Sequence, residues 1–149
     1  MKRLKKHFVV VGYIINDKNV LLVHHRKLGL WLPVGGHIEA NETPEDALKR
    51  EAKEEADIEI EIAGSRDEAG DVKGTVEVLT NPDHIQLEDI DARHQHIDLA
   101  YFARTRSSSV KLKADEHHEI RWFSEKELDS PDITANVRHF ARKAIKELG

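Results

Sequence analysis

The sequence predicts a single α/β (α+β) domain over residues 1–149, in which a mixed β-sheet lies between helices. Short apolar and β-branched segments, typical of strands, alternate with two segments whose apolar residues recur at helical spacing. A chain of 149 residues is long enough for a proper core, and it contains no internal repeat, low-complexity tract or linker that would divide it. These observations together favour a layered sandwich of sheet and helices.

The N-terminal part of the expected sheet is a hairpin followed by a short extended segment. Residues 8–16 and 20–25 are rich in apolar and β-branched side chains, and residues 16–19 have the composition of a turn. Residues 31–34 form the extended segment, and the glycine pair after it is expected to end it. Further strands are predicted at residues 58–62, 76–79, 96–104 and 119–123. Apart from 76–79, residues 64–93 are polar, and a stretch of this length indicates a functional or mobile loop region.

Two main helices are expected. The first begins after Thr43, a natural N-cap, with Pro44 at the first helical position and Asp46 completing a capping-box-like pattern. It is expected to end near residues 56–57, where a strand pattern takes over. The apolar positions at helical spacing are Leu48, Ala52 and Ala56 in this helix and Ile133, Val137, Phe140, Ala141, Ala144, Ile145 and Leu148 in a C-terminal helix.

The composition excludes several classes of protein. A formal net charge of −5 argues against a basic surface that binds nucleic acid, and no apolar run approaches the ~20 residues of a membrane span. The chain has no cysteine, so disulfide and thiolate chemistry are excluded. This absence fits the reducing cytosol, and we expect a cytoplasmic protein.

Three glutamates on the first expected helix need an explanation. Glu51, Glu54 and Glu55 fall within an arc of about 100°, although like charges four residues apart destabilise a helix by about 0.2–0.5 kcal/mol per pair. Carboxylates on a rigid element, with carbonyl groups of glycine-rich backbone nearby, form a site for a hard cation such as Mg²⁺ or Mn²⁺. Arg50 is four residues from Glu54 and can pair with it. The competing interpretation is a solvated face, the common role of glutamate-rich helices.

The longer pattern around these glutamates resembles the signature of the Nudix hydrolases. Residues 36–58 read GHIEANETPEDALKREAKEEADI. The residues that match the family signature in register are Gly36, Glu42, Arg50, Glu51, Glu54, Glu55 and Ile58. Asp57 stands where the family usually has glycine, which affects the turn that ends the helix but not the proposed ligands. The resemblance covers nearly the whole chain and implies a Nudix-type α/β/α sandwich.

The resemblance also implies a chemistry. Nudix enzymes cleave a diphosphate linkage in a small nucleotide-type substrate, either a nucleoside diphosphate joined to another group or a nucleoside triphosphate, with Mg²⁺ or Mn²⁺. By position, Glu51, Glu54 and Glu55 are the expected metal ligands. A main-chain carbonyl of Gly35 or Gly36 is expected to complete the set.

Other residues are assigned supporting roles by the same resemblance. Arg50 is expected to orient a glutamate, and Glu42 to support the geometry of loop and helix. The base that takes a proton from the attacking water is either a glutamate of the signature or a residue on a distant loop. Glu116, in a polar stretch before a strand, is the candidate for that base or for an extra ligand.

Two alternatives to a pyrophosphohydrolase stay open at this point. A Nudix-fold binding or regulatory module would recognise a nucleotide-like ligand without turnover, and it would be expected to lose carboxylates that this chain keeps. A structural α/β domain outside the family would fail to bind divalent metal. Family members occur as monomers and as homodimers, and the sequence favours neither.

Overall fold

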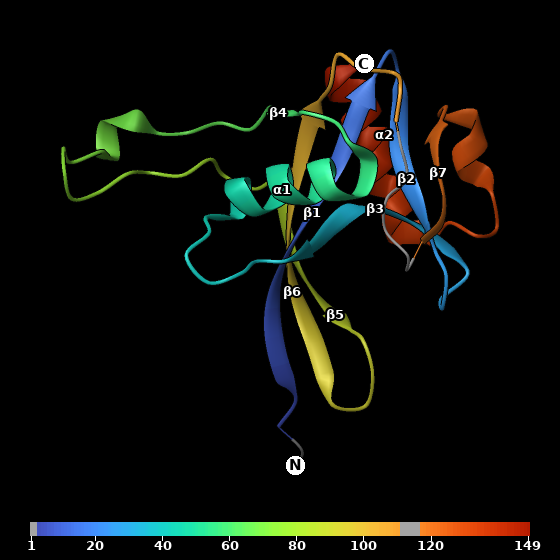
Figure 1. The fold of residues 1–149 in the computed structure, drawn as a ribbon, viewed down its shortest axis with the longest axis horizontal. Helices are drawn as coiled ribbons and strands as arrows, with labels where there is room; N and C mark the ends of the chain where they lie inside the picture. The colour runs from blue at the N-terminus through green and yellow to red at the C-terminus, as the bar shows by residue number, and fades with distance from the viewer. Residues whose placement is uncertain (1–2, 111–116) are drawn as a thin grey trace.

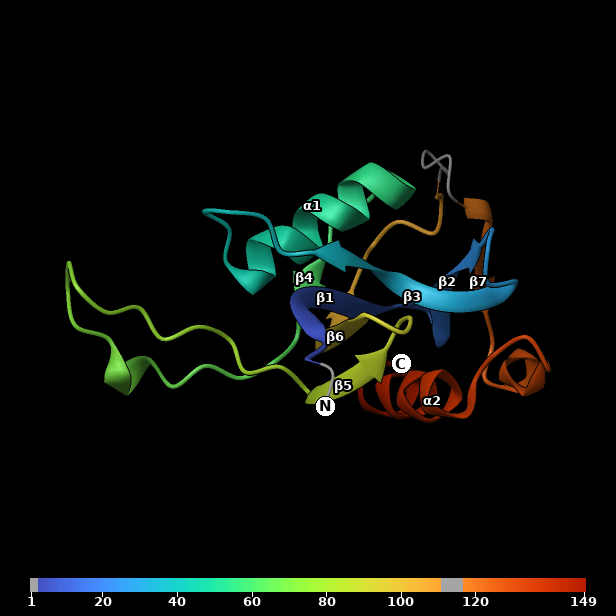
Figure 2. The same ribbon diagram turned by 90° about the horizontal axis from the view of Figure 1, so that it is seen from below.

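The computed structural model describes residues 3–110 and 117–149. Its centre is a mixed seven-stranded sheet, with α1 against one face and α2 against the other (Figures 1 and 2). The strands are β1 (Lys5–Asn16), β2 (Asn19–His25), β3 (Leu30–His37), β4 (Glu61–Ile62), β5 (His84–Asp89), β6 (His94–Arg104) and β7 (His117–Phe123). The helices are α1 (Pro44–Ala56), α2 (Ala135–Leu148) and two 3₁₀ turns, η1 (Glu68–Gly70) and η2 (Lys126–Asp129). The predicted sandwich of a mixed sheet between helices is confirmed.

The sheet is organised around β1. The strand order is β4-β6-β1-β3-β2-β7, and β5 pairs with the outer part of β6. β1 runs parallel to β6 along almost its whole length and antiparallel to β3. Because β3 leads directly into the loop before α1, this pairing fixes the start of that loop relative to the central strand.

Alternation along β1 divides the core into two layers. Val10 and Ile14 are fully buried on the side of α1, where they pack in clusters with α1 residues such as Leu48. Tyr13 and Ile15 are buried on the opposite side, in a cluster that includes Val137 of α2. Each helix therefore covers one face of the sheet through a stripe of the predicted apolar residues.

The strand predictions need four corrections. The glycine pair does not end β3, because Gly35 and Gly36 pair in register with β1. Within the predicted strand at 58–62, only Glu61–Ile62 pairs, at the end of β6. Residues 76–79 form no strand, and Val76 makes only an isolated bridge with Val72.

The fourth correction is β5, which lies inside the stretch predicted to be loop. Its side chains alternate between half-buried and exposed, and the apolar Ile85 and Leu87 are on the exposed face. The apolar side chains of β5 face outward, which is not the usual burial pattern of a strand. The polar residues on either side of it in the sequence favour a loop instead. The chain between β4 and β5 extends far from the sheet as a long arm (Figures 1 and 2).

None of the described helices is both long and apolar enough to span a membrane.

Candidate active site

Helix α1 begins and ends where the sequence predicts. The hydroxyl oxygen of Thr43 accepts a hydrogen bond of 3.1 Å from the main-chain N–H of Asp46, and Pro44 occupies the first turn. Asp57 ends the helix in the left-handed conformation, with φ 55° and ψ 42°, and its N–H donates to the carbonyl of Lys53 at 3.1 Å. The aspartate thus adopts the geometry for which glycine is usual.

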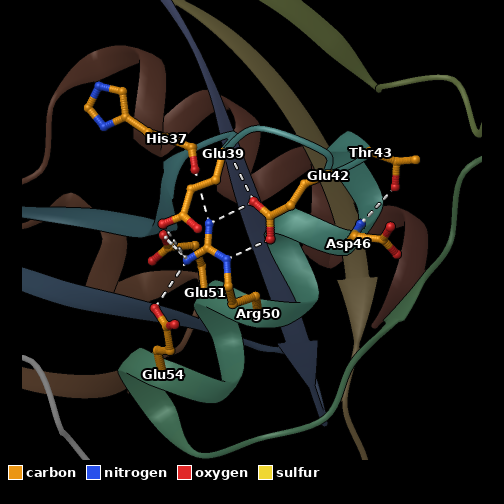
Figure 3. Close-up of polar contacts among 8 residues, drawn as sticks. All are labelled: His37, Glu39, Glu42, Thr43, Asp46, Arg50, Glu51 and Glu54. Atoms are coloured by element: carbon orange, nitrogen blue, oxygen red, sulfur yellow. Dashed lines mark hydrogen bonds and ion pairs between the residues drawn. The ribbon is translucent and has the colours of Figure 1, made fainter.

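Arg50 joins the loop before α1 to the glutamates of the helix (Figure 3). Its Nε and Nη2 donate to the two carboxylate oxygens of Glu42 at 2.7 and 3.0 Å, and Nη2 also donates to the carbonyl of His37 at 3.1 Å. On the other edge of the guanidinium group, Nη1 donates to Glu51 at 2.9 Å and to Glu54 at 3.1 Å. The predicted Arg50–Glu54 ion pair is present, and one planar cation orients three carboxylates.

Glu42 is held from two directions. Besides the two bonds from Arg50, its Oε1 accepts a hydrogen bond of 2.9 Å from the main-chain N–H of Glu39. The hydrogen bond from Arg50, followed by that from the main chain, lowers the pKa of the Glu42 carboxyl group. Through these contacts Glu42 ties the loop to the helix.

The three glutamates of the proposed metal site differ in burial. The Glu55 residue is 5% exposed, the side chain of Glu51 is 14% exposed and that of Glu54 is 60% exposed. Burial, and next the charge of Glu55, raise the pKa of Glu51 to about 7. The repulsion inferred from the sequence is therefore a property of the folded site, and a divalent cation would relieve it.

The backbone of β3 leaves space for this carboxylate. A Cβ atom on Gly36 would collide with the carboxylate of Glu51, and one on Gly35 would collide with the carbonyl of Val10. Glycine at position 36 is thus required for Glu51 to lie against the strand. The donors present, namely carboxylates beside glycine main chain, fit a hard cation such as Mg²⁺ or Mn²⁺.

A cleft of about 640 Å³ opens beside these residues. Gly35, Gly36 and Glu55 line one part of it, and Tyr13 and Val137 line the part between β1 and α2. A second hollow, of about 690 Å³, lies around the C-terminal end of α1 and includes none of the three glutamates. We therefore assign the first cleft as the candidate active site, because Glu55 and the two glycines of β3 line it.

Four further residues bear on the candidate site, and one of them, Glu116, is predicted from the sequence. Glu116 lies outside the described residues, so its proposed role stays a prediction. Glu88, His96 and Asp98 also line the cleft, and the sequence predicts no role for the two carboxylates among them. The alternation in His94-Gln95-His96-Ile97-Asp98 places His96 and Asp98 on one face of a strand, which is the signal that could have found them.

Comparison with known proteins agrees with this geometry. The sequence model of the NUDIX domain family matches residues 5–146. The structure resembles the crystal structure of a hydrolase of the NUDIX family from Clostridium perfringens, with a TM-score of 0.90 and 35% identity over 98% of this chain and 100% of that chain. It also resembles a MutT NUDIX hydrolase from Burkholderia pseudomallei in fold, with a TM-score of 0.68 and 21% identity over 97% of this chain and 99% of that one.

A curated relative is similar over a shorter segment. An 8-oxo-dGTP diphosphatase from Proteus vulgaris is 39% identical over 61 residues, which are 38% of this chain and 54% of that protein. The match thus spans about half of the relative's length, whereas the family match covers nearly all of this chain. Residues 5–146, the fold and the arrangement of the signature residues all lead to one assignment: the chain belongs to the Nudix family.

Proposed function

We propose that this protein is a divalent-metal-dependent pyrophosphohydrolase that cleaves a diphosphate linkage in a small nucleotide-type substrate. The observation that carries the proposal is the Arg50 network, which orients Glu51 and Glu54 beside a cleft that Glu55 lines. Family membership supports a Nudix-type pyrophosphohydrolase, and so does the similarity to a protein named as a diphosphatase. A module without turnover would not need this set of oriented carboxylates.

The proposed metal ligands are Glu51, Glu54 and Glu55, with a main-chain carbonyl of Gly35 or Gly36. When bound, Mg²⁺ or Mn²⁺ would neutralise phosphate oxygens and lower the pKa of a water molecule. The protein's own contribution is to fix the carboxylates in advance, so that little reorganisation is needed when the charged substrate arrives.

Arg50 acts in this scheme as a positioning residue, because its guanidinium group is already saturated by carboxylates and a carbonyl. The proton of the attacking water goes to a carboxylate, and the two candidates are a glutamate of α1 and Glu116. A Glu116→Gln variant separates them. Loss of kcat with unchanged metal affinity would assign the base to Glu116, and unchanged kcat would assign it to α1.

The cleft suits a small substrate. Its volume of about 640 Å³ is in the range of pockets that enclose nucleotide-sized ligands. Tyr13 and Val137 offer an apolar wall on the side away from α1, against which a base can pack. We propose a nucleoside triphosphate as the substrate, with oxidised purine nucleotides as the first to test, since the curated relative is named for one.

The test is hydrolysis of nucleoside triphosphates, 8-oxo-dGTP, nucleotide sugars, dinucleotides and ADP-ribose, each with Mg²⁺, with Mn²⁺ and with EDTA. Chromatography of the products would show which bond is cleaved. We expect turnover that EDTA abolishes and that Glu54→Gln lowers at least ~10²-fold. Glu59→Gln, at an exposed glutamate outside the metal site, is the matched control and should retain full activity. Metal binding without turnover of any substrate would favour the binding module.

A further inference from the structure

A second set of potential metal ligands lies in the cleft, on strands rather than on α1. Glu88 of β5 is directly opposite His96 of β6, and Gln86 is opposite Asp98. Side chains two residues apart on a strand share a face, so all four project to the same side of this ribbon. One ligand atom from each of Glu88, His96 and Asp98 lies within 4.8 Å of the other two.

Asp98 is the most informative member of this set. The residue is 2% exposed, and its Oδ2 accepts a hydrogen bond of 2.8 Å from the side-chain amide of Gln86. Its Oδ1 is also buried, yet among the described residues it has no hydrogen-bond partner. Leaving a buried charged acceptor unsatisfied is costly, and Asp98 lines the cleft. The buried oxygen therefore points either to a proton shared with Glu88 or to a ligand from outside the protein.

The charges nearby favour a cation as that ligand. Glu88 and Asp98 are two carboxyl groups on neighbouring strands, and neither forms an ion pair with a lysine or arginine in the part of the chain that the structure describes. Burial, next the charge of Asp98, and then a side-chain hydrogen bond with Asp98 raise the pKa of Glu88 to about 7. A proton shared by the two carboxyl groups is the competing account, but it makes no use of the imidazole that completes the set.

We propose that Glu88, His96 and Asp98 form a site for a divalent transition-metal ion, separate from the site on α1. One imidazole nitrogen and two carboxylate oxygens favour Zn²⁺ or Mn²⁺ over Mg²⁺, whereas the all-oxygen site on α1 suits Mg²⁺. Three protein ligands leave coordination positions for water or for a molecule in the cleft. The ion would thus lie where a substrate binds, although the proposal does not depend on hydrolysis.

Two histidines close to His96 determine which control variant the metal-binding experiment needs. The ring of His96 lies 5.1 Å from that of His37 and 6.4 Å from that of His7, measured between centroids. Such a group can bind Zn²⁺ weakly without any carboxylate. His7→Gln is therefore the matched control, because it removes one imidazole of this group and none of the three proposed ligands.

The experiment is a calorimetric titration of the whole protein with Zn²⁺ in excess Mg²⁺, combined with anomalous diffraction at the zinc edge. We expect one Zn²⁺ per chain, with the anomalous peak between Glu88, His96 and Asp98. Affinity should fall at least ~10-fold in Glu88→Gln and in Asp98→Asn, while Glu54→Gln and His7→Gln should bind Zn²⁺ as the wild type does. Thermal unfolding without metal would verify that Glu88→Gln, on a peripheral strand, is folded.

Three results would overturn the proposal: no Zn²⁺ bound, an anomalous peak only at α1, or unchanged affinity in Glu88→Gln. Unchanged affinity in Glu88→Gln would mean that Glu88 and Asp98 share a proton instead of binding a metal ion, or that the histidines alone bind Zn²⁺. These experiments measure Zn²⁺ binding and not hydrolysis. If the protein proved not to be a hydrolase, the substrate assay would show it, and the Zn²⁺ result would still stand.

Discussion

Arg50 and Glu42 form a two-pronged ion pair across eight residues of sequence, with N–O distances of 2.7 and 3.0 Å. The planar guanidinium group reaches this carboxylate with one edge and Glu51 and Glu54 with the other. A single side chain thereby couples the fold of the loop to the orientation of the proposed metal ligands.

Arg50→Lys should therefore lower activity although the positive charge is kept. An ammonium group cannot donate to three carboxylates in one plane, so Glu51 and Glu54 would lose their fixed orientation. We expect kcat to fall at least ~10-fold and the Mg²⁺ concentration needed for half-maximal activity to rise, as for the loss of an orienting partner. Metal-titrated initial rates measure both. An Arg50→Lys enzyme with wild-type metal dependence would show that the network does not position the ligands.

Gly36→Ala should disturb the site more than the fold. The added methyl group meets the flexible carboxylate of Glu51, whereas in Gly35→Ala it meets the main-chain carbonyl of Val10. We expect Gly36→Ala to fold, with kcat lowered at least ~10-fold, and Gly35→Ala to show a clear loss of thermal stability. Circular dichroism melts and initial rates on both variants test this. Full activity in Gly36→Ala would mean that the position of Glu51 is not critical.

In the metal-free protein, the contribution of Glu51 to stability should fall as the pH rises from about 4.5 to about 7. Glu51 has a pKa of about 7 in the folded state against 4.5 as its ordinary value. The folded state therefore binds the proton more tightly, and the contribution of this group is complete below pH 4.5 and lost as the pH passes 7. In EDTA, Glu51→Gln should become progressively more stable than wild type over this range, as measured by melting temperature. Parallel pH profiles for the two proteins would contradict the assigned burial and repulsion.

Asp57→Gly should be tolerated or mildly stabilising. Asp57 has φ 55°, a conformation that glycine adopts without steric cost. The variant also loses an exposed ion pair of 3.1 Å with Lys53, which is worth at most about 1 kcal/mol. We therefore expect a change in unfolding free energy within about 1 kcal/mol in denaturant titrations. A larger loss of stability would show that the aspartate side chain, rather than the turn, holds the end of α1.

The sequence predicts the parts of the fold that depend on local signals. Thr43 and Pro44 mark the start of α1 through capping chemistry that acts within four residues, and the helix begins there. β5 was missed because Ile85 and Leu87 are exposed, so its alternation does not indicate a buried face. Edge pairing depends on what lies alongside in space, which local patterns do not encode.

The same difference between local signals and contacts in space applies to the candidate site. The relative positions of Glu51, Glu54 and Arg50 can be predicted from the sequence, because helical geometry converts sequence separation directly into position. The proximity of Glu88 to Asp98 cannot be predicted in this way, because it depends on the register of two strands. The turn that joins these strands has no sequence signal that fixes its geometry.

We propose that the carboxylates oriented by Arg50 bind a metal ion that hydrolysis requires. The most direct test is the rate of hydrolysis of the best substrate as a function of Mg²⁺ concentration, for wild type, Glu54→Gln and the Glu59→Gln control. We expect no turnover in EDTA, saturable activation by Mg²⁺ in wild type and control, and a kcat at least ~10²-fold lower in Glu54→Gln. Equal kcat and equal Mg²⁺ dependence in all three proteins would contradict it.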